Sequence, residues 1–182
     1  MQKIILGFIG QLASGKGTLA KYCSEKYSAK TYRFSTMLRD ILDRLYIEKS
    51  RENLQKISRV LRENFGQDLM SRVIAEDVNN DQGAIIIVDG VRRPTDITYL
   101  ETNPNFYLVY ITANQKIRWG RLVKRRENPG DETKTFAEFC QDEQAEAEKH
   151  IEKLGQKAKF VINNDGSFED LYKQLEDIVT TI

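Results

Sequence analysis

The sequence contains little of what marks several classes of protein. Its 182 residues include only two cysteines, Cys23 and Cys140, too few and too far apart for a disulfide scaffold or a zinc knuckle. Its apolar runs are too short for a signal peptide or a membrane span. Basic and acidic residues, 28 and 27, leave a net charge of +1, which provides no general attraction to nucleic acid or to an anionic membrane. We therefore expect a cytoplasmic protein with neither partner.

Apolar runs alternate with helical patterns along the chain. Continuous apolar runs at 3–9, 84–90 and 105–112 are typical of strands buried on both faces, and shorter strands are predicted at 29–34 and 159–164. Apolar residues three or four apart predict helices at 18–27, 35–46, 50–79 (one helix, or two broken near Gly66), 94–101, 113–128, 135–154 and 167–179. This alternation predicts one α/β domain over residues 1–182, with about five parallel strands between two layers of helices.

A glycine-rich turn joins the first predicted strand to the first predicted helix. Gly10 and Gly15 allow the backbone to approach an anion closely, and the amides at the start of a helix favour phosphate. Lys16 follows at once and would neutralise the outer phosphates. This spacing is that of a phosphate loop, except that Gly17 precedes the expected hydroxyl residue. We expect ATP to bind at Gly10, Ala13, Ser14, Gly15, Lys16, Gly17 and Thr18.

The order Gly-Lys-Gly-Thr at 15–18 resembles the phosphate loop of adenylate kinase and of the wider nucleoside monophosphate kinase family. Three later stretches follow in the family's order: STMLR at 35–39 resembles STGDMLR, DGVRRP at 89–94 resembles DGFPRT, and RLVKRR at 121–126 resembles RIVGRR. The resemblance covers residues 3 to about 127. It implies a three-layer P-loop core (1–34, 80–120 and 155–182), a helical acceptor-binding insertion at about 35–79 and a short lid region at about 121–140.

The resemblance also implies a role for each matching residue. The acceptor would be bound by Ser35, Arg39, Arg92 and Arg93, and the transferring phosphoryl group would be stabilised by Lys16, Arg93, Arg121 and Arg125. Thr18 and Asp89 would hold Mg²⁺, largely through water, and Asn163 and Asn164 would lie near the ATP base or ribose. Arginine suits these positions because its planar fork binds phosphate by paired hydrogen bonds and stays charged.

The match ends after the predicted lid. No arginine follows Arg126, and the lid proper, about 127–134, lacks metal-binding cysteines. These departures suit the wider family, which includes deoxynucleoside monophosphate kinases and dephospho-coenzyme A kinases. We expect a kinase that transfers the γ-phosphoryl group of ATP to a (deoxy)nucleoside monophosphate, as a monomer or homodimer. A dephospho-coenzyme A kinase and a nucleotide-dependent switch are the alternatives.

One helix face also has two interpretations. Arg118, Arg121 and Arg125 recur at helical spacing and share roughly one side of the helix predicted at 113–128. Either these arginines face the transferring phosphoryl group, or they form salt bridges with the acidic residues around 143–148.

Overall fold

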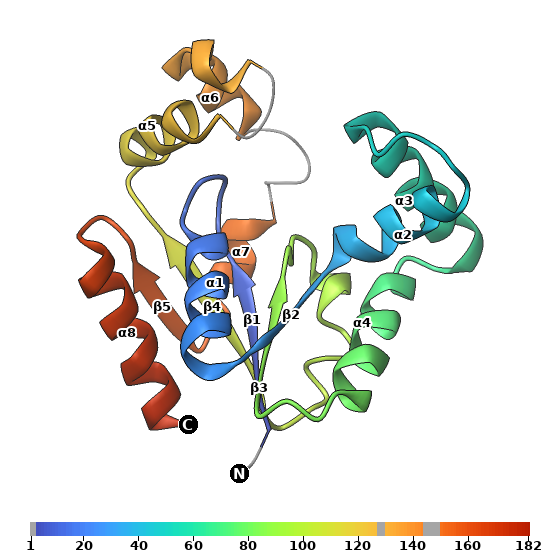
Figure 1. The fold of residues 1–182 in the computed structure, drawn as a ribbon, viewed down its shortest axis with the longest axis horizontal. Coiled ribbons are helices and arrows are strands. Elements are labelled where there is room, and N and C mark those ends of the chain that lie inside the picture. Colours follow the sequence, from blue (N-terminus) through green and yellow to red (C-terminus); the bar gives the residue numbers. More distant parts are fainter. Residues whose placement is uncertain (1–2, 127–129, 144–149) are drawn as a thin grey trace.

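The computed structural model describes residues 3–126, 130–143 and 150–182 (Figure 1). Its centre is a five-stranded sheet in the order β2-β3-β1-β4-β5, and every pairing is parallel. The strands are β1 (Ile4–Ile9), β2 (Lys30–Arg33), β3 (Ile85–Asp89), β4 (Phe106–Thr112) and β5 (Phe160–Asn163). The α/β prediction is confirmed, and each predicted strand is present within two residues of its expected bounds.

Helices cover both faces of this sheet. On one face, α1 (Lys16–Tyr27) and α8 (Phe168–Thr181) pack against alternate residues of β1 such as Leu6 and Phe8. On the other face, α2 (Phe34–Arg44), α4 (Leu69–Asn80) and α7 (Ile151–Gly155) pack against Ile5 and Ile9. Burial on both sides explains why β1 reads as a continuous apolar run.

Two helical groups rise beyond the carboxyl edge of the sheet (Figure 1). One contains α2, α3 (Arg51–Phe65) and the start of α4, and the break between α3 and α4 lies at Gly66, whose φ is +105°. The other contains α5 (Gln115–Arg125) and α6 (Phe136–Asp142). Trp119 Nε1 of α5 donates a 2.8 Å hydrogen bond to the carbonyl of Lys134, in the segment just before α6. Among the described residues, no helix has both the length and the apolar character needed to cross a membrane.

Three predicted helices differ from the structure. The helix predicted at 94–101 is only a 3-10 turn, Pro94–Asp96, because the Asp96 carboxylate accepts hydrogen bonds from the N–H groups of Arg92 and Arg93 and holds a loop there. The helix predicted at 113–128 ends at Arg125, and residues 127–129 lie outside the described residues. The helix predicted at 135–154 is α6, a turn at 143 and α7, with residues 144–149 outside the described residues.

Candidate active site

The loop between β1 and α1 has the geometry of an anion site. Ala13 and Gly15 both adopt positive φ, +59° and +110°, so the chain curls back before the helix begins. A Cβ on Gly10 would lie 2.2 Å from the Ile111 carbonyl oxygen, which explains the glycine there. No side chain caps the N-terminus of α1. Its first amide N–H groups, which lack intrahelical partners, therefore suit phosphate oxygens.

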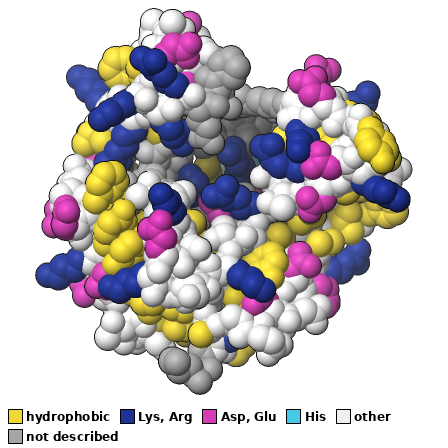
Figure 2. Space-filling view, in the orientation of Figure 1, with side chains coloured by type: hydrophobic (Ala, Val, Ile, Leu, Met, Phe, Trp, Pro, Cys, Tyr) yellow, Lys and Arg dark blue, Asp and Glu magenta, His cyan; other side chains and the backbone are white. Residues whose placement is uncertain are grey.

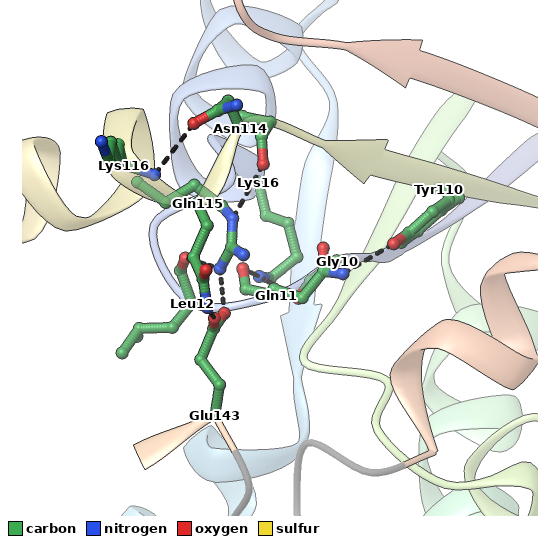
Figure 3. A network of polar contacts seen from close by, with 11 residues as sticks. Gly10, Gln11, Leu12, Lys16, Tyr110, Asn114, Gln115, Lys116 and Glu143 are labelled. Atoms are coloured by element: carbon green, nitrogen blue, oxygen red, sulfur yellow. Dashed lines mark hydrogen bonds and ion pairs between the residues drawn. The ribbon is translucent and has the colours of Figure 1, made fainter. Parts of the chain in front are cut away.

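Side chains bind the carbonyl oxygens of the same loop. Lys16 Nζ donates to the carbonyls of Gly10 (2.6 Å) and Gln11 (2.9 Å) and so lies along the loop (Figure 3). Asn164 Nδ2 donates to the Ser14 carbonyl over 2.8 Å, and Arg118 Nη1 donates to the Leu12 carbonyl over 3.2 Å. The carbonyl groups are thus directed toward protein donors. The resemblance places Asn164 near the ATP base or ribose, but neither its contact with Ser14 nor that of Arg118 with Leu12 was predicted.

Three buried polar atoms at this loop have no hydrogen-bond partner among the described residues. They are Gln11 Oε1, Ser14 Oγ and Arg121 Nη1. Buried polar atoms are nearly always bonded, so three of them around one loop favour a polar ligand there. Ser14 and Arg121 belong to the predicted site, whereas Gln11 was missed, since a side chain inside the loop motif carries no spacing signal.

Arg121 reaches the loop from α5. Its Nη2 donates to the Asn164 carbonyl (2.8 Å) and to Asn164 Oδ1 (3.3 Å), which places the guanidinium beside the residue that binds Ser14. Burial lowers the pKa of Arg121, and the charge of Asp165 opposes that shift. The predicted Asn163 lies one residue away but is exposed, and its side chain donates to Asp165. The structure therefore brings Arg121 to the loop, with Asn164 in between.

The proposed acceptor residues follow β2 and β3, next to the loop. Asp89 ends β3 beside Phe8 of β1, and its Oδ2 forms an ion pair with Arg33 Nε at 3.0 Å. Arg33 was not among the predicted site residues. Arg92 and Arg93 follow Asp89. Because the carboxyl ends of parallel strands meet at one edge, these groups lie on the loop's side of the sheet.

The remaining predicted residues lie on two helices. Ser35, in the first turn of α2, is partly buried, and Arg39 one turn later is exposed. Arg125 is exposed in the last turn of α5. Lys and Arg side chains gather in the hollow between the two helical groups (Figure 2).

The oxygen donors available at this edge fit Mg²⁺ only through additional ligands. Thr18 lies in the first turn of α1, and Asp89 ends the neighbouring strand β3. Within the described residues, no group of three or more His, Cys, Asp or Glu side chains could hold a metal. A hydroxyl and one carboxylate suit Mg²⁺ that keeps its waters and is bound mainly by phosphate oxygens.

The chain is similar to known proteins over most of its length. A family model described as an AAA domain matches residues 9–139. A UPF0200 protein of Hyperthermus butylicus is 26% identical over 180 residues, which cover 99% of this chain and 95% of that protein. A UPF0200 protein of Sulfurisphaera tokodaii is 27% identical over 179 residues, with coverage of 98% and 97%.

Solved structures of low sequence identity share the fold. A shikimate kinase of Bacteroides thetaiotaomicron has a TM-score of 0.64 at 13% identity and covers 98% of this chain and 97% of its own. A shikimate kinase of Acinetobacter baumannii in complex with shikimate has a TM-score of 0.57 at 14% identity, with coverage of 98% and 94%. A Thermus thermophilus protein has a TM-score of 0.62 at 16% identity, with coverage of 100% and 99%. The fold is that of P-loop kinases, and the assignment of this chain to the nucleoside monophosphate kinases in particular stays a prediction.

Proposed function

The chain belongs to the AAA domain family, and we propose that it is a phosphotransferase that moves the γ-phosphoryl group of ATP to a (deoxy)nucleoside monophosphate. The donor phosphates would lie over the uncapped start of α1, in the loop from Gly10 to Thr18. Lys16 would exchange the carbonyls of Gly10 and Gln11 for phosphate oxygens. Mg²⁺, held by the phosphates, Thr18 and Asp89 through water, would supply charge neutralisation.

The observation that carries this proposal is the gathering of cationic side chains at one edge of the sheet. Arg33 is the last residue of β2, Arg92 and Arg93 come shortly after β3, and Arg39 lies in the second turn of α2. Across the loop, Arg121 is anchored by Asn164. Two anions can be brought together only when their charge is neutralised, and a phosphate acceptor is already a nucleophile that needs no general base. The arrangement therefore favours transfer between two phosphorylated molecules.

A hydroxyl acceptor is the second candidate, because the structural neighbours include two shikimate kinases. Dephospho-coenzyme A is the other acceptor of this kind. Such an acceptor would need a carboxylate near the loop to take its proton. Asp89 lies at that edge, but its Oδ2 is already engaged in an ion pair with Arg33, which disfavours this role.

The division of the chain into parts is also proposed. The core would be 1–34, 80–120 and 155–182, the acceptor-binding insertion about 35–79, and the lid about 121–140, of which 127–129 lie outside the described residues. Closure of the lid would exclude water and bring Arg121 and Arg125 to the transferring group. We further propose a cytoplasmic monomer or homodimer that acts on ATP and a small acceptor, without nucleic acid or membrane.

A coupled assay of ADP formation across an acceptor panel tests this proposal. The panel contains ribo- and deoxynucleoside monophosphates, dephospho-coenzyme A and shikimate, each with Mg²⁺ and ATP. We expect at least one nucleoside monophosphate to accelerate ADP formation well above the rate without acceptor. Acceleration only by a hydroxyl acceptor would favour the second candidate. Equal rates with and without every acceptor would favour a nucleotide-dependent switch.

A further inference from the structure

Arg118 is a buried arginine that the proposed chemistry does not use. It lies in α5, is 5% exposed, and packs 5.6 Å from the centre of the Phe139 ring of α6. Its Nε donates to the Ala113 carbonyl over 2.9 Å, and its Nη1 donates to the Leu12 carbonyl of the phosphate loop over 3.2 Å. A guanidinium withdrawn from water and bonded to two carbonyls acts as a rigid brace between α5 and the loop.

Glu143 supplies the countercharge for Arg118 from the end of α6. Glu143 Oε1 forms an ion pair with Arg118 Nη1, and Glu143 Oε2 accepts a 2.7 Å hydrogen bond from Gln115 Nε2 (Figure 3). The side chain of Glu143 is only 13% exposed. One atom, Arg118 Nη1, therefore contacts both the phosphate loop and the C-terminal cap of α6, the helix of the proposed lid region that we call the lid helix.

The contact with Leu12 matters because a phosphate loop works only when its amides face the ligand. Rotation of a peptide plane moves its carbonyl oxygen and the following N–H in opposite directions. The bond from Arg118 holds the Leu12 carbonyl toward α5. That bond therefore fixes the plane shared with the N–H of Ala13, whose φ is already +59°.

We propose that Arg118 is a positioning residue that sets the phosphate loop for ATP, and that Glu143 links this setting to the position of the lid helix. The inference rests on the proposed binding of ATP at this loop. When the lid helix holds Glu143 against Arg118, the loop keeps the conformation that binds ATP. When the lid helix moves Glu143 away, the affinity for ATP falls. A buried ion pair that loses one partner leaves an uncompensated charge, so the two side chains must act together.

Calorimetric titration with Mg²⁺–ATP tests the pair through four chains: wild type, Arg118→Lys, Glu143→Gln and the double variant. We expect Arg118→Lys to weaken binding about tenfold, because an ammonium group cannot bond three acceptors in the plane of a guanidinium. Glu143→Gln should weaken it about threefold, and the double variant should lose less than the product of the single losses, since both act through one contact. In steady-state kinetics, the KM for ATP should rise while the KM for the acceptor stays unchanged, a split that general loosening of the fold would not give.

Two control variants each remove one charge beside the pair, and Asp142→Asn makes the same charge change as Glu143→Gln. Lys116→Met removes an exposed cation from α5, and Asp142→Asn removes the acidic side chain before Glu143, which is paired with Lys134. Both should bind ATP within twofold of wild type. If Arg118→Lys does not fold, Glu143→Gln alone tests the proposal. An affinity of Glu143→Gln for Mg²⁺–ATP within 1.5-fold of wild type would then overturn it. Folded single variants that bind like wild type, or fully multiplicative losses, would also overturn it. A wild-type chain that binds no ATP would instead refute the proposed function, before any variant is made.

Discussion

Asn164 donates a 2.8 Å hydrogen bond from its side-chain amide to the carbonyl oxygen of Ser14, 150 residues earlier in the chain. The same side chain accepts from Arg121 through Oδ1. The loop after β5 thus bridges the phosphate loop and the arginine that we propose acts during transfer. Asn164 is 4% exposed, and a Cβ on Gly15 would lie only 2.2 Å from its Nδ2.

Removal of this bridge should impair both stability and catalysis. Asn164→Ala leaves the Ser14 carbonyl without its donor, and we expect a loss of about 1–3 kcal/mol in the free energy of unfolding. Its kcat should fall because Arg121 loses an anchor. Asn163→Ala, at the exposed neighbour, is the control and should change both quantities far less. Urea unfolding and steady-state kinetics measure the difference, and equal effects at both positions would refute the bridge.

Gly15 and Gly17 should respond differently to the same added methyl group. Gly15→Ala places a side chain at φ +110° against Asn164, so the free energy of unfolding should fall by about 1 kcal/mol or more. Gly17 has no atom within 4 Å of a Cβ and lies in the first turn of a helix, so Gly17→Ala should not destabilise the fold. It should nevertheless weaken ATP binding if phosphate occupies that space. Unchanged ATP affinity in Gly17→Ala would remove Gly17 from the site.

Arg39 and Arg44 offer a matched pair on one helix. Both are exposed on α2, but Arg39 lies a turn and a half nearer the sheet edge. We expect Arg39→Ala to raise the KM for the acceptor about tenfold or more, because a charge-assisted hydrogen bond to its phosphate is lost. The KM for ATP should stay near wild type. Arg44→Ala should leave both constants unchanged, and an equal rise in the two KM values of Arg39→Ala would place Arg39 outside the acceptor site.

Asp81 should make stability depend on pH in the acid range. It pairs with Lys30 Nζ at 2.8 Å, accepts from the Tyr32 hydroxyl at 2.6 Å and accepts from the Gly83 N–H, and these contacts hold its pKa well below the usual range. A lowered folded-state pKa gives stability that is present above the unfolded pKa, about 3.9, and is lost as the pH falls toward the folded value.

The expected result is a gap in unfolding free energy between wild type and Asp81→Asn that is constant near neutral pH. The gap should narrow below about pH 4. Denaturant unfolding at several pH values measures it. Asp177→Asn, an exposed carboxylate on α8, should show no such gap. A gap independent of pH down to pH 2 would show that charge on Asp81 is not responsible.

The fold could be predicted because its signals are local. Apolar runs and helical spacing depend on neighbours within about ten residues, so all five strands were visible in the sequence. The break near Gly66 was one of two alternatives that the sequence left open, and the structure has it. The helix predicted at 94–101 was wrong because Asp96 forms a buried ion pair with Arg62, 34 residues away. Asp96 also accepts hydrogen bonds from the backbone N–H groups of Arg92 and Arg93. No local pattern reports such a contact.

The candidate site also has one part that could be predicted from local sequence and another that could not. The loop from Gly10 to Thr18 is contiguous and could be recognised from spacing alone. The contacts of Asn164, Arg118 and Arg33 could not be predicted, because each forms only when distant segments meet. For Arg118, the alternative of a salt-bridged face is confirmed by its pair with Glu143, whereas residues 144–149 lie outside the described part of the chain.

The fate of the γ-phosphoryl group of ATP decides whether the protein is a phosphotransferase. Phosphorus NMR can follow ATP, Mg²⁺ and the best acceptor of the panel with wild type and with Lys16→Ala. We expect one phosphorylated acceptor for each ADP formed by wild type, and a rate lower by on the order of 100- to 1000-fold in a folded Lys16→Ala chain. Release of inorganic phosphate at the same rate with and without acceptor, or unchanged turnover in Lys16→Ala, would contradict this expectation.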